Sequence, residues 1–170
     1  MPSDISNMDE GEQSANGGQQ PAKSVPLYFT LQYIKDLSFE NPRAPEVYDD
    51  FEQPDVEINV NVGARTVGER SFEVILKLSI EGKASGQTSF IIELEYAGIA
   101  QVSPDIEPEN VQPLVLIEGP RMLFPFARAI IANLTRDAAF PLLLLGQMDF
   151  ITMYREGMAQ AAAQGANPQI

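Results

Sequence analysis

Three consecutive stretches between residues 56 and 102 alternate apolar and polar side chains, and this alternation constrains the fold more than any other feature. The stretches are "VEINVNV" (56–62), "SFEVILKLSIEG" (71–82) and "TSFIIELEYAGIAQV" (88–102). A period of two places apolar residues on one face of a β-strand. We therefore expect three neighbouring antiparallel strands with one buried and one partly solvated face. The first turn is expected between Gly63 and Gly68, and the second in "KASGQ".

The segments on either side complete the expected fold. "VPLYFTLQYIKDLSFE" (25–40) predicts a strand that makes the sheet four-stranded, and prolines make "NPRAPEVYDDFEQPD" (41–55) and "SPDIEPENVQP" (103–113) connections. From Arg121 the apolar period is helical, with onset near Pro120 or near Phe124. Asp149 is expected to cap a second helix. Strands followed by helices indicate an α+β fold, a four-stranded antiparallel sheet with two C-terminal helices.

The ends of the chain differ in composition from the middle. Residues 1–25 are rich in Ser, Gly, Gln and acid, so we expect a disordered tail, then one domain over 26–158 and a flexible tail over 159–170. The first 25 residues contain no apolar run of the kind that a signal peptide needs, and no stretch reaches the length of a membrane span. We expect a cytoplasmic protein without direct membrane insertion.

Composition also excludes several kinds of chemistry. The chain contains no cysteine and no histidine, which removes thiol nucleophiles, zinc thiolate sites and histidine-dependent triads. No cofactor motif is present, because "GKASGQTS" has Gln87 where a phosphate loop requires lysine. The formal net charge of −13 disfavours nucleic acid and favours basic partners. We therefore expect no enzyme, no cofactor and no metal.

Apolar residues are in excess outside the expected strands and helices. Val47, Tyr48 and Phe51 lie in one connection, and Leu142–Leu145 run consecutively in "FPLLLLGQMDF" (140–150). A monomer of this size cannot easily cover all of them, and exposed apolar surface marks interaction sites. If the leucine run is extended, Leu142 and Leu144 share one side and Leu143 and Leu145 the other. The sequence leaves open which pair is exposed.

Four segments carry a resemblance to a known family. "YIKDLSFENPRAPEVY", "FIIELEYAGIAQV", "LFPFARAIIANLTRDAAFPLLLL" and "MDF" followed by "MY" resemble the protein-export chaperone SecB, in the family's order, from about Leu27 to Tyr154. The resemblance implies a four-stranded sheet and two helices that assemble as a homotetramer, a dimer of dimers. It also implies a holdase that keeps precursor proteins unfolded without ATP and delivers them to the SecA translocation motor.

The resemblance further implies three sets of site residues. The surface that docks SecA corresponds to Asp36, Glu40, Ile91 and Glu93. The groove for unfolded precursor proteins corresponds to Phe39, Val47, Phe51, Val56, Ile58, Leu142, Leu144 and Phe150. Positions important for assembly correspond to Phe90, Ile92, Leu94 and Tyr96, which could equally form the core of the single chain.

One departure and two alternative functions accompany this interpretation. The family often has a tryptophan in the crossover connection, but Glu52 stands at the matching position, one place after Phe51. A structural or adaptor oligomer that binds a folded basic partner would also use an acidic surface. A hydrolase that uses Glu93 and Glu95, which lie on one face of a strand, is the other alternative.

Overall fold

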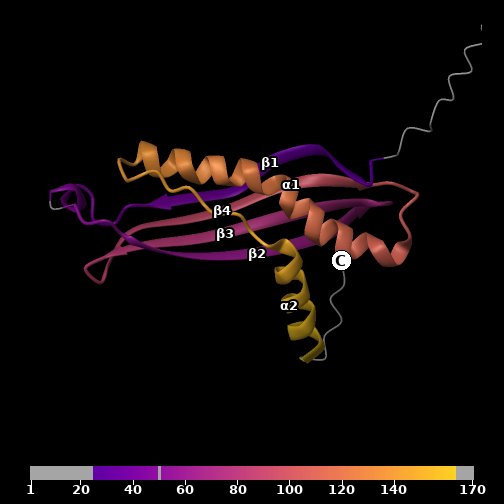
Figure 1. The fold of residues 1–170 in the computed structure, drawn as a ribbon. Coiled ribbons are helices and arrows are strands. Elements are labelled where there is room, and N and C mark those ends of the chain that lie inside the picture. The colour runs from indigo at the N-terminus through magenta and orange to yellow at the C-terminus, as the bar shows by residue number, and fades with distance from the viewer. Residues whose placement is uncertain (1–24, 50, 164–170) are drawn as a thin grey trace, which may run out of the picture.

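The computed structural model describes residues 25–49 and 51–163 of the 170-residue chain. One four-stranded sheet has the strand order β1-β4-β3-β2, with every neighbouring pair antiparallel (Figure 1). The strands are β1 (Leu27–Glu40), β2 (Asp55–Gly68), β3 (Ser71–Ala84) and β4 (Gln87–Val102). A short 3-10 helix η1 (Glu46–Tyr48) and two α-helices, α1 (Pro108–Asp137) and α2 (Phe150–Ala163), complete the described part. The predicted meander is confirmed, with the first strand added beside β4.

The two hairpin turns differ in how well the sequence predicts them. The second turn is confirmed, because Ser85 and Gly86 both have positive φ (51° and 74°), which a two-residue turn of type I′ requires. The first turn was expected too early. Strand β2 runs through Gly63 to Gly68, and the chain reverses at Arg70, whose φ is 53°. The Arg70 guanidinium donates to the carbonyls of Ser103 and Ile106, which ties this turn to the segment before α1.

Helix α1 begins at Pro108, inside the segment that was expected to be a connection, so the predicted onset near Pro120 or Phe124 is wrong. Pro113, Pro120 and Pro125 lie inside this helix of 30 residues. Each proline removes a backbone donor and crowds the preceding turn, which is why the sequence argues against a helix there. Burial outweighs this local cost. Buried residues recur every four positions from the first half of the helix to its end, at Val115, Gly119, Leu123, Ala127, Ile131 and Thr135.

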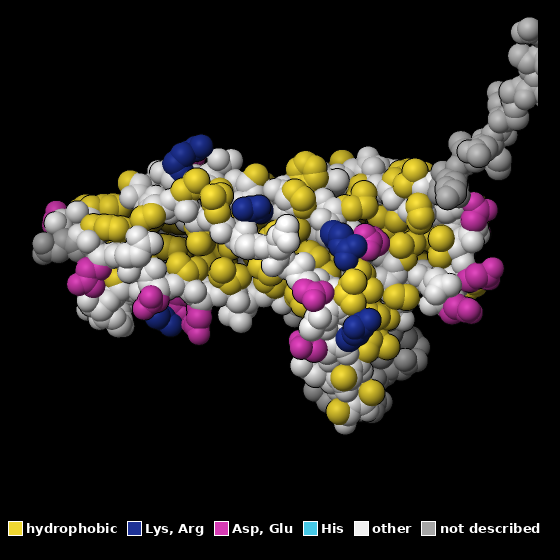
Figure 2. Space-filling view, in the orientation of Figure 1, with side chains coloured by type: hydrophobic (Ala, Val, Ile, Leu, Met, Phe, Trp, Pro, Cys, Tyr) yellow, Lys and Arg dark blue, Asp and Glu magenta, His cyan; other side chains and the backbone are white. Residues whose placement is uncertain are grey.

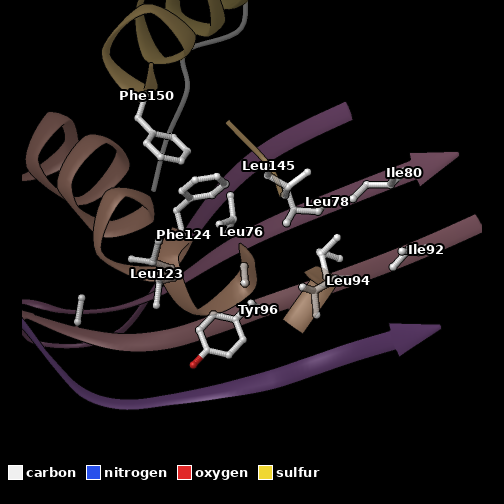
Figure 3. Close-up of a cluster of buried hydrophobic side chains, with 14 of the residues drawn as sticks. Leu76, Leu78, Ile80, Ile92, Leu94, Tyr96, Leu123, Phe124, Leu145 and Phe150 are labelled. Atoms are coloured by element: carbon white, nitrogen blue, oxygen red, sulfur yellow. The ribbon is translucent and has the colours of Figure 1, made fainter. Parts of the chain in front are cut away.

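The core lies between one face of the sheet and α1. Inward-facing residues of β3 and β4 such as Leu76, Leu78, Ile92 and Leu94 are completely buried, and α1 contributes Leu123 (Figure 3). The opposite face of the sheet carries no helix in the described part of the chain (Figure 1). The two faces therefore differ: one is apolar and covered, and the other is available to solvent.

Helix α2 begins where the sequence predicts. The Asp149 carboxylate accepts hydrogen bonds from the backbone N–H groups of Ile151 (3.1 Å) and Thr152 (3.0 Å), which confirms Asp149 as the N-cap. The helix projects from the β2 side of the sheet (Figure 1) and continues to Ala163, beyond the expected domain end at residue 158. The rest of the two predicted tails, residues 1–24 and 164–170, lies outside the described residues. Neither described helix is long and apolar enough to cross a membrane.

Candidate functional site

The segment between α1 and α2, here called the leucine linker (residues 138–149), crosses the sheet in an extended conformation (Figure 1). Leu142 and Leu144 are 53% and 58% exposed, whereas Leu145 is 1% exposed and points toward Leu78 in Figure 3. Leu143 is half-buried against the core, and its backbone N–H donates to Thr135 Oγ1 of α1 (3.1 Å). The expected alternation is confirmed, and the structure shows that Leu142 and Leu144 are the exposed pair.

Beside the linker, aromatic side chains gather around Phe140. The Phe140 ring lies 5.0 Å from Phe90, 5.7 Å from Tyr48 and 6.5 Å from Phe51, measured between ring centroids. The Tyr48 hydroxyl donates to the Ala138 carbonyl (2.6 Å), so it joins the connection after β1 to the linker. Tyr48 and Phe51 remain exposed while Phe140 is buried. The cluster thus presents the rings of Tyr48 and Phe51 at the surface, packed on the buried ring of Phe140.

A pocket of about 440 Å³ lies between β2 and α2, and Phe150, the residue that follows the linker, is one of its lining residues. Val60 and Val62 of β2 line one side, and Phe150 and Met153 of α2 line another, with Leu116 of α1 nearby. Ile58, further along β2, is exposed. Figure 2 shows hydrophobic side chains extending over this face of the molecule toward α2. We call the exposed residues of the linker, the aromatic cluster and this pocket together the apolar groove.

The eight residues expected in the groove fall into three groups. Phe51, Ile58, Leu142 and Leu144 are exposed, and Phe39 and Val56 are half-buried. Val47 and Phe150 are buried; Val47 belongs to the core, and Phe150 forms the floor of the pocket, where its ring contacts Phe124 at 6.0 Å. Sequence reasoning did not assign Val60, Val62 or Met153 to the groove, although the alternation in "VEINVNV" places both valines on the same face as Ile58.

The four residues expected to dock a basic partner lie together on the uncovered sheet face. Glu40 of β1 is directly opposite Ile91 of β4, and Asp36 is opposite Glu95. Glu93 lies between them, opposite Ser38, and accepts a hydrogen bond from Ser79 Oγ of β3 (2.6 Å). We call this group, with Glu95, the acidic face. Glu95 was not assigned to it from the sequence, although it follows Glu93 by two positions on the same strand.

One cation lies within the acidic face. Lys77 of β3 forms an ion pair with Glu95 (3.0 Å). The hydrogen bond and the charge of Glu95 raise the pKa of Lys77, and the charges of Glu93 and Asp36 raise it further. A lysine ammonium is thus stabilised by several carboxylates at once, which is the interaction that a lysine-rich partner segment would make here. Within residues 25–49 and 51–163, no group of acidic side chains is arranged to hold a metal ion.

The four residues expected to be important for assembly are all buried in the single chain. Phe90, Ile92, Leu94 and Tyr96 face α1 and the linker and belong to the core of the single chain, and their role in assembly stays a prediction. They have almost no surface left to contact another copy directly. Exposed apolar residues lie elsewhere, along the edge strand β1 at Tyr28, Leu31, Ile34 and Leu37 and on α1 at Met122 and Phe126.

Comparison with known proteins assigns the chain to a family. The family model described as "Preprotein translocase subunit SecB" matches residues 19–161. The protein-export protein SecB of Rhodospirillum rubrum is 50% identical over 147 residues, which cover 85% of this chain and 90% of that protein. The SecB protein of Rhodopseudomonas palustris strain TIE-1 is 48% identical and covers 88% of this chain and 97% of that protein.

A solved structure supports the fold independently. It is a SecB-like chaperone of Mycobacterium tuberculosis in complex with a ChAD peptide from the HigA1 antitoxin. It matches with a TM-score of 0.56 at 18% identity, over 72% of this chain and 91% of that chain. Since the family model covers most of the chain and several relatives share nearly half of their residues with it, the chain belongs to the SecB family.

Proposed function

We propose that this protein is a chaperone that binds unfolded precursor polypeptides and keeps them competent for export. The observation that carries the proposal is the apolar groove, in which Leu142, Leu144, Phe51 and Ile58 are exposed. Their neighbours Leu145 and Phe140 are buried, so the exposed side chains stand on a packed part of the chain. Natural monomers rarely leave such a surface uncovered without a binding role. Membership of the SecB family supports the same function.

Binding in the groove requires no sequence code. Unfolded chains present scattered apolar and aromatic segments, and burying apolar surface stabilises a complex by about 25 cal/mol per Å² without directional constraints. The exposed rings of Tyr48 and Phe51 provide additional contacts for aromatic client residues. The protein therefore acts by binding and release, without a nucleotide and without a chemical step.

The acidic face is the proposed docking surface for the SecA translocation motor. Asp36 and Glu40 on β1 and Glu93 on the neighbouring strand β4 are close together, so their negative charges add to the electrostatic potential of the same surface. Each exposed ion pair contributes about 0.2–1 kcal/mol, and several must form together for useful affinity. Client groove and docking surface lie on different sides of the sheet, so client and motor can be bound at the same time.

The working particle is proposed to be a cytoplasmic homotetramer, a dimer of dimers. Strand β1 is an edge strand of 14 residues with exposed apolar side chains, and such an edge pairs readily with another strand. The exposed Met122 and Phe126 on α1 are four residues apart and form a second apolar surface for another copy. Several grooves on one particle would hold a long client with avidity.

The groove is tested by aggregation of unfolded clients. Purified protein without nucleotide should suppress light scattering by two unrelated denatured proteins at near-stoichiometric amounts. The double variant Leu142→Ser/Leu144→Ser should lose most of this suppression, because it removes exposed apolar contacts. The control is Val67→Ser, which changes an exposed valine at the other end of β2. Full suppression by the double variant would contradict the groove, and no suppression by the parent would contradict the chaperone function and favour an adaptor.

Docking on the acidic face is tested separately. Asp36→Ala and Glu93→Lys should each weaken binding of SecA in a titration, and Glu93→Lys more strongly, because it reverses a charge. The control Glu69→Lys reverses a charge in the turn between β2 and β3, away from the acidic face. Unchanged SecA affinity in both acidic-face variants would refute this docking surface. That result would not bear on the apolar groove.

A further inference from the structure

A buried carboxylate on β3 joins three strands on the same sheet face as the acidic face. Glu73 is 2% exposed. Its Oε1 accepts hydrogen bonds from Tyr33 Oη (2.5 Å) and Lys35 Nζ (2.9 Å), both on β1. Its Oε2 accepts from Arg65 Nε on β2. Glu73 therefore links the two edge strands of the sheet, and neither the groove nor the acidic face uses it.

The β1 partners of Glu73 lie at an irregularity in that strand. Tyr33 is opposite Ala97 and Ile34 is opposite Tyr96, but the next residue of β4, Glu95, is opposite Asp36. Lys35 is thus an extra residue, a β-bulge. Glu73 accepts hydrogen bonds from Lys35 itself and from Tyr33, two positions before it, so its contacts to β1 are concentrated at the bulge.

The bulge decides which side chains of β1 face outward. With it, Asp36, Ser38 and Glu40 lie opposite the outward-facing residues of β4. Without it, Lys35 would be opposite Glu95, and every later residue would turn to the other face, because side chains alternate with a period of two. Asp36 and Glu40 would then point toward the helices, and Leu37 and Phe39 would point outward.

Burial alone specifies this register weakly. Ile34 and Leu37, which flank the bulge on the helix-facing side, keep 48% and 37% of their surface exposed. Phe39 is only half-buried beside Phe90, at a ring-centroid distance of 6.4 Å. A shift of register therefore loses little apolar burial in the single chain. A polar contact at the bulge can then determine which of the two registers β1 adopts.

We propose that Glu73 is a positioning residue that fixes the bulge at Lys35 and thereby keeps Asp36 and Glu40 on the acidic face. Charge-assisted hydrogen bonds of this kind are stronger than neutral ones. Removing Glu73 would leave Tyr33 and Lys35 without their acceptor, and the bulge would lose its specific support. The consequence for docking rests on the proposed function, whereas the register itself does not.

The absence of cysteine allows the register to be measured with engineered disulfides. Ser38→Cys/Glu93→Cys reports the observed register, in which these residues are opposite each other. Leu37→Cys/Glu93→Cys reports the register without the bulge. Directly opposed residues in antiparallel strands have Cα atoms about 4.5–5.5 Å apart, within the range that a disulfide accepts. Peptide mapping by mass spectrometry identifies which cysteines are paired, and the mass of the denatured, non-reduced protein distinguishes intrachain from interchain bonds.

Glu73→Ala in the two reporter backgrounds is the deciding experiment. We expect the Leu37–Glu93 reporter to form its disulfide about fivefold more than with Glu73 present, and the Ser38–Glu93 reporter to form less. Glu69→Ala, which removes a glutamate from the β2–β3 turn, is the matched control and should change neither reporter. Unchanged reporters in folded Glu73→Ala would overturn the proposal.

Two further variants separate positioning from general stability. Glu73→Gln keeps the side-chain volume and one acceptor oxygen, so it should restore part of the native register relative to Glu73→Ala. If Glu73→Ala does not fold, Lys35→Gln replaces it, since it removes only the ion pair at the bulge and should shift the reporters in the same direction. Equal reporter ratios in Lys35→Gln and the parent would then contradict the proposal.

Binding of oligolysine to the same variants connects the register to the acidic face. We expect Glu73→Ala to weaken this binding about fivefold relative to Glu69→Ala, because Asp36 and Glu40 leave the face. Altered reporters with unchanged oligolysine binding would support the positioning role and contradict docking on this face. The two proposals therefore fail by different results.

Discussion

At the scale of single residues, neighbouring leucines of one segment have opposite roles. Leu145 is buried beneath the linker, while Leu144, one residue earlier, is exposed. Extended backbone turns successive side chains to opposite sides, so one side of the linker can pack on the core and the other can remain available to a client. Thr135 of α1 stabilises this arrangement, because its hydroxyl oxygen accepts a hydrogen bond from the backbone N–H of Leu143.

The two sides of the linker should respond differently to truncation. Leu145→Ala should lower the free energy of unfolding by about 2–5 kcal/mol, because it leaves a cavity in the core. Leu144→Ala, the matched control, should change it by no more than about 0.5 kcal/mol. Urea denaturation at fixed protein concentration measures both. Similar values for the two variants would mean that the linker does not pack as described.

Glu73 should make stability depend on acid pH. The hydrogen bond from Tyr33 is the main cause that lowers the pKa of Glu73 to about 2, from 4.5; burial opposes this shift, and Lys35 and Arg65 add to it. The folded state therefore binds this proton more weakly than the unfolded state. The stabilisation is complete above pH 4.5 and is lost as the pH falls toward 2.

The comparison with Glu73→Gln isolates this contribution. The difference in free energy of unfolding between parent and variant, about 1–3 kcal/mol at neutral pH, should narrow between pH 4.5 and pH 2. Urea titrations at several pH values measure it, and Glu69→Gln provides the control for loss of a surface carboxylate. A difference that stays constant over this range would show that Glu73 titrates normally in the folded chain.

At the scale of elements, the contact between α1 and the sheet depends on a position without a side chain. A Cβ atom at Gly119 would lie 3.0 and 3.1 Å from the two methyl groups of Val74 on β3. The glycine therefore allows the helix to approach the strand closely, in a helix that already contains three prolines. Close packing here compensates for the weak local helix tendency of the same segment.

A side chain at position 119 should separate the helix from the sheet. Gly119→Val should lower the free energy of unfolding by about 1–3 kcal/mol, through overpacking against Val74. Val74→Ala in the same chain should recover part of this loss, because it removes the methyl groups that clash. Thermal unfolding of the single and double variants measures the coupling.

Gly157 of α2 is the control for this change. A Cβ atom there would have no neighbour within 4 Å, so Gly157→Val should have little effect on stability. Equal destabilisation by the two valine substitutions would mean that the contact with Val74 does not explain the result, since valine has a higher helix propensity than glycine at both positions.

At the scale of the whole molecule, the uncovered surfaces lie at separate places on the fold. One side of the sheet carries the helices and the linker (Figure 1), and hydrophobic side chains gather on that side (Figure 2). The residues of the acidic face lie on the other side of the sheet. The β1 edge and the exposed residues Met122 and Phe126 of α1 are the surfaces proposed to contact other copies. The proposed surfaces use different side chains even where they share an element, as Asp36 and Leu37 do on β1, so the proposed partners need not compete for the same residues.

The helix surface should control assembly. Phe126→Lys places a charge at an exposed apolar position on α1 and should convert the proposed tetramers into smaller species, seen as a lower mass by native mass spectrometry. Val67→Lys is the matched control, since it makes the same kind of change at an exposed valine near the end of β2. Secondary structure should stay intact in both variants. A tetrameric Phe126→Lys protein would place the helix contact elsewhere.

The sequence by itself determined the sheet, the two-faced strands and the cap at Asp149. These features are local, because alternation over a few residues selects a strand face. A side chain that bonds a backbone group two or three residues away, as Asp149 does, is visible in the sequence for the same reason.

Tertiary structure alone decided where α1 begins, which leucines are exposed and what Glu73 contacts. Local proline chemistry argues against a helix from Pro108, but burial against β3 and β4 outweighs it. Alternation in the linker predicts two sides, yet only the position of the sheet decides which side is covered. Tyr33 and Lys35 are far from Glu73 in the sequence and contact it across an intervening strand. Such a contact depends on which strands become neighbours in space, and no local sequence pattern specifies that.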